Sequence, residues 1–318
     1  MRGERLRRER RRRDAPLRRR RRRRIDHRFS AAPTQHDPGG PPVSASYLIL
    51  NCYPAASRRN FDASDIGHPH DFFTKILRRV RPGAAVDVLF AADPGAALPT
   101  GAALADYDGV LWTGSDLTAY HADDERVIRM IELARAGFDS GARQWGSCWG
   151  AQIAAVAAGG EVAKNPKGRE WAFARNVSVT PAGRASMLFD AKADRFDGYI
   201  MHLDEIVKLP DGCELLATND HTKVQAISVL RGAGSFWATQ YHPEYDLFEM
   251  ARLIAGRAGP LVREGFFENE AAVLSQADAM KRLYASPDNA SLRAALSIGD
   301  DLLDAAVVNR ELVNWLNA

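Results

Sequence analysis

The stretch Gly146-Ser147-Cys148-Trp149-Gly150-Ala151-Gln152 decides the fold of this 318-residue chain and points to its chemistry. It lies between an apolar strand-like run that ends near Trp145 and a small-residue helix expected over Ala151–Ala158. The two glycines that flank the cysteine give the clearance that a sharp strand-to-helix turn needs, so the pattern predicts a nucleophile elbow. Unpaired N–H groups at the helix N-terminus favour the thiolate of Cys148, which is the attacking form of the side chain.

A base and an acid follow in the stretch Gln240-Tyr241-His242-Pro243-Glu244. His242 and Glu244 are two residues apart at the end of the strand-like run Ser235–Tyr241, and the period of a strand predicts that both side chains lie on one face. A lone cysteine or histidine is usually a structural residue. Nucleophile, base and acid in a strand–turn–helix context together favour a catalytic triad.

Two further segments complete the pattern, Trp112-Thr113-Gly114-Ser115 and Met201-His202-Leu203-Asp204-Glu205. In order and spacing, over residues 46–250, the four segments resemble the class I (triad) glutamine amidotransferases. The resemblance is greatest to the glutaminase domain of GMP synthase and its stand-alone relatives. It implies a flavodoxin-like class I glutamine amidotransferase fold and hydrolysis of the glutamine side-chain amide through a thioester on Cys148, with His242 as base and then acid, oriented by Glu244.

The resemblance also implies the groups around the triad. The oxyanion hole maps to the backbone N–H of Trp149 and to one from the turn at Gly114 and Ser115, and each such donor is worth about 3 kcal/mol. Gln152 and His202 map to the substrate-binding residues. For His202, an ordinary strand end with exposed polar side chains is the alternative interpretation.

Two positions depart from the family pattern. This chain has Gly114-Ser115-Asp116 where the family often has Gly-Gly-Pro, and Leu203 where it often has glycine. The first departure concerns the oxyanion donor, and the second concerns the fit of the backbone end of the substrate.

Charge is divided unevenly along the chain. Residues 1–28 contain sixteen arginines and four acidic residues, a net charge of +12, whereas the remainder carries −9. Such a segment repels itself and cannot bury apolar area, so we expect residues 1–45 to be a disordered Arg-rich tail. Arginines neutralise phosphates, which gives a nucleic-acid-binding protein as the alternative function from another class. The abrupt change in composition favours a translation start near Val43, so that residues 1–42 would not belong to the mature protein.

Composition limits the other classes of protein. Apolar residues make up 46% of the chain, which is enough for a sizeable core, and the three cysteines do not form a disulfide framework. We expect a cytoplasmic protein without a membrane segment, because no signal peptide and no long apolar run is evident. Cys52 and Cys213 are interpreted as structural. His68, His70 and Asp71 suit a helix start better than a metal site, and no phosphate loop is evident, so we expect neither metal nor cofactor.

The order of apolar runs predicts an α/β fold. Strands expected at 47–52, 85–90, 109–113 and 143–145 alternate with helical patterns at 71–81 and 123–136, which is typical of parallel βαβ units. Later strands separated mostly by turns predict an antiparallel excursion from a mostly parallel central sheet. Cys148 and His242 would then meet at the carboxyl edge of that sheet.

We therefore expect a glutamine amidotransferase domain over residues 46–250 and a helical C-terminal extension over 251–318, ending in one helix at 301–316. The expected substrate is glutamine, whose ammonia would pass to an unidentified acceptor. A partner synthetase or a second copy in a homodimer could use the apolar face of the last helix. The alternative enzyme is a γ-glutamyl hydrolase that acts on another γ-glutamyl compound.

Overall fold

The computed structural model describes residues 45–318. The Arg-rich tail predicted over residues 1–45 and the translation start predicted near Val43 therefore lie outside the described residues, except for residue 45 itself. The strands are β1 Ser46–Asn51, β2 Ala85–Phe90, β3 Gly109–Trp112, β4 Arg143–Ser147, β5 Glu161–Lys164, β6 Glu170–Val179, β7 Arg195–His202, β8 Asp204–Lys208, β9 Cys213–Thr218, β10 Ala226–Arg231 and β11 Gly234–Thr239. The helices up to the last strand are α1 Ala55–Ala63, α2 Pro69–Val80, α3 Gly101–Leu104, α4 Glu125–Ser140, α5 Trp149–Ala158 and α6 Pro181–Ala185. Those after it are α7 Leu247–Gly256, α8 Ala258–Arg263, α9 Glu270–Ala285, α10 Ala290–Leu296, α11 Asp300–Leu303, α12 Ala305–Val308 and α13 Arg310–Asn317.

A nine-stranded mixed sheet forms the centre of this region, with the order β2-β1-β3-β4-β11-β10-β9-β6-β7. The strands from β2 to β11 pair in parallel, and the strands from β11 to β7 pair antiparallel. Strands β5 and β8 form a separate antiparallel pair. The predicted α/β class, with a parallel core and an antiparallel excursion, is confirmed, and the excursion contributes as many neighbouring pairs as the parallel core.

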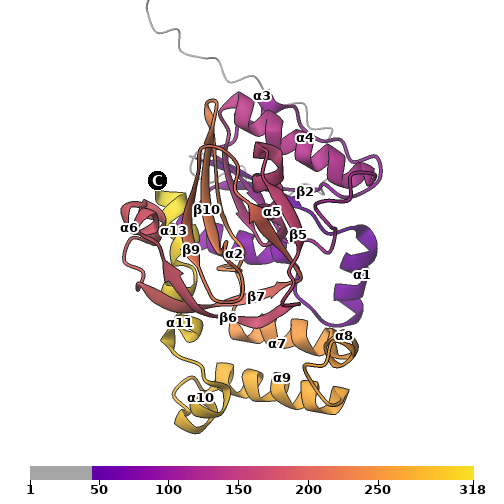
Figure 1. Cartoon of the computed structure of the whole chain (residues 1–318), viewed down its shortest axis with the longest axis vertical. Coiled ribbons are helices and arrows are strands. Elements are labelled where there is room, and N and C mark those ends of the chain that lie inside the picture. Colours follow the sequence, from indigo (N-terminus) through magenta and orange to yellow (C-terminus); the bar gives the residue numbers. More distant parts are fainter. Residues whose placement is uncertain (1–44) are drawn as a thin grey trace, which may run out of the picture. The chain divides into compact units, whose positions relative to one another are not determined.

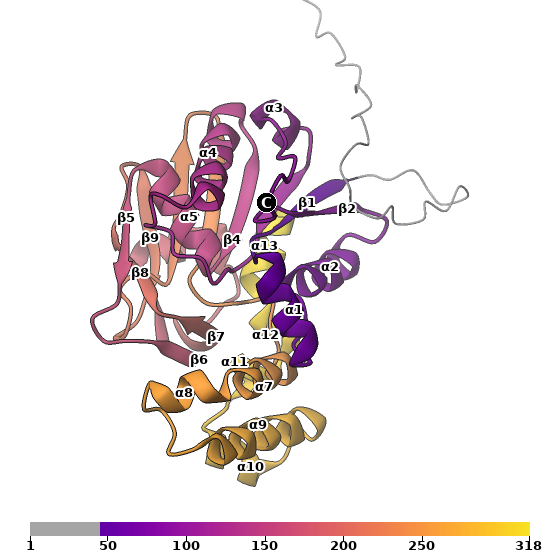
Figure 2. The ribbon, with the colours of Figure 1, turned by 90° about the vertical axis from the view of Figure 1, so that its right-hand side faces the viewer.

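Helices cover both faces of the sheet. On one face, α4 and α5 pack their apolar side chains against β1, β3, β10 and β11. On the other face, α2 and α13 pack against the same central strands and against β6 and β7. Figure 2 shows α4 and α5 on one side of the sheet and α2 and α13 on the other. Parallel strands covered on both faces can be apolar throughout, which is why β1 and β3 read as continuous apolar runs.

A third apolar cluster joins the helices after β11 to the antiparallel excursion. Helices α7 and α9 pack on each other and on side chains of β6 and β7. In Figures 1 and 2, α7 to α10 lie beyond β6 and β7. A domain limit at residue 250 remains a prediction, and α7 crosses it.

The helix predicted at 301–316 is wrong as a single element, because three short helices replace it. The backbone of Asp304 is extended, and its side chain accepts the N–H of Ala306, so one helix ends there and the next begins. The apolar face of α13, with Leu312, Trp315 and Leu316, is buried on the sheet of its own chain. Within residues 45–318, no helix combines the length and the apolar character that crossing a membrane requires.

Candidate active site

Cys148 is the single residue between β4 and α5. Its backbone has φ of +55° and ψ of −106°, a left-handed conformation that a non-glycine residue rarely adopts. Glycines close to it allow neighbouring backbones to touch: a Cβ on Gly146 would lie 2.6 Å from the carbonyl carbon of Gly150, and a Cβ on Gly150 would lie 2.9 Å from the carbonyl oxygen of Trp112. The turn is therefore held in its strained form by packing that only glycine permits.

His242 and Glu244 lie in a turn rather than at the end of a strand. The sequence places them on the strand that precedes them, but β11 ends at Thr239. The N–H of His242 then donates to the carbonyl of Tyr199 in β7 at 2.7 Å, so the turn is fastened to another strand of the sheet. In this turn Nδ1 of His242 lies 2.7 Å from Oε1 of Glu244. The two side chains meet because the chain reverses, not because of the two-residue period of a strand.

The electrostatics of this pair favour the protonated ring. The side chains of His242 and Glu244 are 3% and 0% exposed. Burial alone lowers the pKa of His242, but the charge of Glu244 and hydrogen bonds to Cys148 and Glu244 outweigh burial and raise this pKa from 6.5 to about 10. The imidazolium is therefore the stable form at neutral pH, and it can give a proton to a leaving group.

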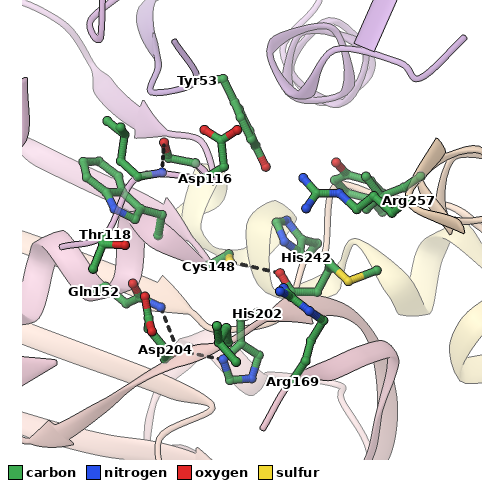
Figure 3. Close-up of a pocket in the computed structure, with 17 residues that line it drawn as sticks. Tyr53, Asp116, Thr118, Cys148, Gln152, Arg169, His202, Asp204, His242 and Arg257 are labelled. Atoms are coloured by element: carbon green, nitrogen blue, oxygen red, sulfur yellow. Dashed lines mark hydrogen bonds between the residues drawn. The ribbon is translucent and has the colours of Figure 1, made fainter. Parts of the chain in front are cut away.

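The thiol and the ring face each other across Gly114. A Cβ on Gly114 would lie 3.2 Å from Cε1 of His242 and 3.7 Å from Cβ of Cys148, so this glycine borders both side chains. The thiol also donates a weak hydrogen bond to the carbonyl of Met201 at 3.8 Å, as Figure 3 shows. The structure thus brings the three residues of the predicted triad together at the carboxyl ends of β3, β4 and β11.

Two residues behind Glu244 were not identified from the sequence. The hydroxyl of Ser147 donates to Oε2 of Glu244 at 2.9 Å, and the indole N–H of Trp145 donates to the oxygen of Ser147 at 3.2 Å. Both residues are fully buried. This chain of donors holds the carboxylate in place and leaves its other oxygen for His242.

The C-terminal helices brace the turn that carries His242. The hydroxyl of Tyr241 donates to Oε1 of Glu311 in α13 at 2.6 Å. The side-chain amide of Asn309 donates to the carbonyl of Pro243 at 2.5 Å. Glu311 is itself buried beside Lys192, with 3.1 Å between Oε2 and Nζ. Glu311 in α13 therefore fixes the residue before His242, and Asn309, which precedes α13, fixes the residue after His242.

The predicted oxyanion donors border the same space. Trp149 is the first residue of α5, so its N–H has no acceptor within the helix. Ser115 follows β3, and its hydroxyl donates to the carbonyl of Cys52 at 2.7 Å and accepts from the N–H of Leu117 at 3.1 Å. The side chain of Ser115 thus fixes the turn after Gly114, so that Ser115 itself is left with its backbone to face a substrate.

His202 and Gln152 belong to a buried polar network on the other side of Cys148. Nε2 of His202 lies 3.0 Å from Oε2 of Glu170, and its Nδ1 lies 2.8 Å from the carbonyl oxygen of Asp204. The same carbonyl accepts from the side-chain amide of Gln152 at 2.9 Å. Burial raises the pKa of Glu170, but the contacts with His202, together with Asn219 and His221, outweigh burial and lower this pKa. Because His202 is only 3% exposed, the interpretation as an exposed strand end is wrong.

A pocket of about 170 Å³ opens in front of Cys148. Figure 3 shows the side chains around it. Besides the predicted residues, its lining includes Tyr53, Arg169, Arg257 and Asp116, of which only Asp116 was named from the sequence, as a departure from the family pattern. Tyr53 and Asp116 follow β1 and β3, and the rule that ligands bind at the carboxyl ends of parallel strands could have found them. The two arginines carry no comparable signal in the sequence.

The other cysteines and the histidines near the start of α2 are not part of this pocket. Cys52 and Cys213 are kept as thiols, because burial raises the pKa of each to about 12. Nε2 of His68 lies 2.8 Å from Oδ1 of Asp62, and Nδ1 of His70 lies 2.8 Å from the side-chain nitrogen of Asn51. In the part of the chain that the structure describes, no three potential metal ligands gather.

Comparison with known proteins gives relatives along most of the chain. Residues 84–255 match the family model described as glutamine amidotransferase class-I. A gamma-glutamyl-L-1-hydroxyisopropylamide hydrolase from a Pseudomonas species is 33% identical over 275 residues, which is 85% of this chain and 91% of the relative. Gamma-glutamyl peptidase 4 of Arabidopsis thaliana is 26% identical over 57% of this chain and 71% of its own length.

Other matches are more distant or shorter. GMP synthase of Leifsonia xyli is 27% identical over 65% of this chain, and the match spans 40% of that enzyme. A crystal structure of a glutamine amidotransferase from Thermotoga maritima superposes with a TM-score of 0.59 at 18% identity, covering 86% of this chain and 96% of the other. This last likeness concerns the fold alone.

Proposed function

The chain belongs to the class I glutamine amidotransferase family and is a hydrolase of that family, and on this basis we propose that it hydrolyses γ-glutamyl amides. In this reaction the amide bond between the γ-carboxyl group of a glutamyl residue and an amine is cleaved. The observation that carries the proposal is the meeting of Cys148 with the buried pair of His242 and Glu244 at a pocket that the turn at Gly114 borders.

The proposed reaction begins with the thiolate. Sγ of Cys148 attacks the γ-carbonyl carbon, and the carbonyl oxygen becomes an oxyanion. The imidazolium of His242 gives its proton to the amide nitrogen, the C–N bond breaks, and the amine leaves. A γ-glutamyl thioester remains on the cysteine. Water then attacks this thioester while His242 takes a proton from it, the C–S bond breaks, and glutamate and the free enzyme are formed.

The proposed roles follow from the surroundings of each group. Glu244 keeps Nδ1 of His242 protonated and turned toward it, which leaves Nε2 for the proton exchange with sulfur, amine and water. The N–H of Trp149 and one from the turn at Gly114 and Ser115 would hold the oxyanion, each worth about 3 kcal/mol. Gln152, fixed through the carbonyl of Asp204, would contact the glutamyl group.

Two observations support a substituted γ-glutamyl amide in preference to glutamine. The relative from Pseudomonas, which matches over 91% of its own length, is named as a hydrolase of gamma-glutamyl-L-1-hydroxyisopropylamide, which is a substituted γ-glutamyl amide. Both departures from the family pattern, Asp116 and Leu203, line the pocket. Release of ammonia from glutamine for a partner synthetase is the second candidate, and the similarity to GMP synthase favours it.

A comparison of substrates tests the proposal. L-γ-glutamylethylamide and L-glutamine would be offered to the enzyme, and glutamate release measured for both. We expect kcat/KM for the ethylamide to exceed that for glutamine by roughly tenfold or more, because a pocket that accommodates additional methylene groups gains that much from them. Cys148→Ala should abolish both activities, whereas Cys213→Ala, which alters a thiol outside the pocket, should leave them unchanged. Hydrolysis of glutamine alone would favour the second candidate, and full activity of Cys148→Ala would refute both.

A further inference from the structure

Besides His242, four charged side chains line the pocket: Asp116, Arg169, Asp204 and Arg257. The first three have partners or lie at its edge. Arg169 forms a paired contact with Glu264, with distances of 2.6 and 2.9 Å from Nε and Nη2 to the two carboxylate oxygens. Asp204 accepts a hydrogen bond from the hydroxyl of Tyr120 at 3.2 Å. Asp116 is exposed at the rim. Arg257 differs from all three.

Arg257 lies at the junction between α7 and α8, where it ends the first helix and precedes the second. Its side chain is half-buried, and among residues 45–318 no hydrogen bond or ion pair engages its guanidinium group. Figure 3 shows the guanidinium directed into the pocket beside His242 and Tyr53. The charge of Arg257 is felt by Glu264, whose pKa it helps to lower, but that carboxylate is paired with Arg169. Within the described residues the guanidinium therefore has no ion-pair partner of its own, and an anion in the pocket would stabilise this partly buried cation.

The positive charge of Arg257 also acts on two tyrosines beside it. Burial raises the pKa of Tyr53 and of Tyr245, and in both cases the charge of Arg257 opposes that rise. The guanidinium thus acts on the two buried rings that wall this side of the pocket. An anion bound there would contact a guanidinium, with a phenol hydroxyl beside it as a further donor.

A γ-glutamyl group carries a suitable anion. Its α-carboxylate and α-ammonium sit on one carbon, two methylenes away from the carbonyl that Cys148 would attack. A guanidinium binds a carboxylate through two parallel N–H···O bonds, which fixes orientation as well as position. In Figure 3, Asp116 and Arg257 lie on the same side of the pocket, on either side of the end of the Tyr53 ring.

Resting on the function proposed above, we propose that Arg257 binds the α-carboxylate of the γ-glutamyl substrate, with Asp116 facing the α-ammonium. Arg257 lies just outside residues 84–255, the part that matches the family model. The helices after this part therefore do more than brace the fold, since they supply the group that selects a glutamyl head over other acyl groups.

The test removes the carboxylate from the substrate and the guanidinium from the enzyme in turn. L-γ-glutamyl-p-nitroanilide is compared with 4-aminobutyryl-p-nitroanilide, which is the same molecule without its α-carboxylate. Wild type should prefer the first substrate. Arg257→Ala should reduce kcat/KM for it by about 10- to 100-fold, mostly through KM, and leave the second substrate within about twofold. Arg257→Lys should restore part of the loss. Arg263→Ala, an exposed arginine of α8 outside the pocket, is the matched control.

The outcomes separate the inference from the proposed function. Equal losses on both substrates, or no loss on either, would overturn the role of Arg257. If wild type hydrolyses neither compound, the proposed function fails, and binding still decides the inference. L-Glutamate should then raise the melting temperature of wild type and of Arg263→Ala but not of Arg257→Ala, and 4-aminobutyrate should raise none. A rise with glutamate in Arg257→Ala equal to that in wild type would refute the inference.

Discussion

The replacement Glu244→Gln tests the buried ion pair most directly. The variant keeps the volume of the side chain and removes its charge, 2.7 Å from Nδ1 of His242. The hydroxyl of Ser147 can still donate to the amide oxygen, and the amide N–H₂ then faces the ring. Nδ1 must accept that hydrogen bond, so the proton moves to Nε2, which is the wrong tautomer for a general base. We expect kcat to fall by roughly two to four orders of magnitude, by analogy with the same change in the serine protease triad.

The same variant changes the dependence of stability on pH. In the wild type the pKa of His242 is about 10 in the folded state, above its unfolded value of 6.5. This raised pKa stabilises the fold fully below pH 6.5, and the contribution is lost as pH rises to about 10. Loss of an opposite charge lowers such a pKa by about 1 to 3 units, and each unit is 1.36 kcal/mol. Glu244→Gln should therefore lower the free energy of unfolding by about 1 to 4 kcal/mol at pH 6, and much less at pH 10.

Urea unfolding at a series of pH values, with steady-state kinetics on the same samples, measures both effects. The matched control is Glu249→Gln, a half-buried acid of α7 that pairs with Arg252 outside the pocket. It should change neither kcat nor the slope of stability between pH 6.5 and 10. If Glu244→Gln kept wild-type turnover and the wild-type slope, the carboxylate would not support His242, and the reasoning from the ion pair would be wrong.

Three further changes have expected outcomes. A glutamine-like electrophile should label Cys148 before Cys52 and Cys213, whose raised pKa values keep them as thiols, and peptide mass spectrometry that finds the reverse order would contradict the assignment. Gly150→Ala should destabilise the fold by about 1 to 3 kcal/mol, because its Cβ would lie 2.9 Å from a backbone oxygen, and an unchanged thermal melt would show that the elbow relaxes freely. Glu311→Gln should cost about 3 to 5 kcal/mol, because it removes one partner of a buried ion pair, and denaturant unfolding gives the value; a loss below about 1 kcal/mol would mean that this pair contributes little to stability.

The elbow could be predicted because its requirement is local. A cysteine between two glycines, after an apolar run and before small residues, has few alternatives to a tight strand-to-helix turn. The proximity of His242 and Glu244 was predicted from strand geometry, yet the structure achieves it through a turn. The sequence reasoning found the pair because two residues with a proline between them stay close in either conformation.

Boundaries were harder to predict where the backbone departs from regular values. Strand β6 runs from Glu170 to Val179, and its backbone is irregular along the way. Ala172 and Asn176 both have positive φ, and the register with β7 shifts between Ala174 and Val177. A bulge of this kind breaks the alternation of apolar and polar residues on which strand prediction depends.

The surroundings of the site were the least predictable part. Ser147, Glu170 and Arg257 gain their roles from partners or neighbours far away in the chain, and nothing in their local sequence distinguishes them from structural residues. Glu170 pairs with a histidine 32 positions later. Such long-range contacts are fixed by topology, which a periodic pattern in one sequence does not specify.

The contacts from Glu311 and Asn309 to the turn around His242 also set an order of events during synthesis. Chains emerge from the ribosome N-terminal end first, and folding follows emergence. The elbow of Cys148 needs no element after β11, to which the N–H of Cys148 donates at Thr239, whereas the histidine turn stays unbraced until α13 has been translated. A nascent chain would therefore carry its nucleophile before its base is fixed. Docking of α13 would then be the step that fixes the position of His242 relative to Cys148.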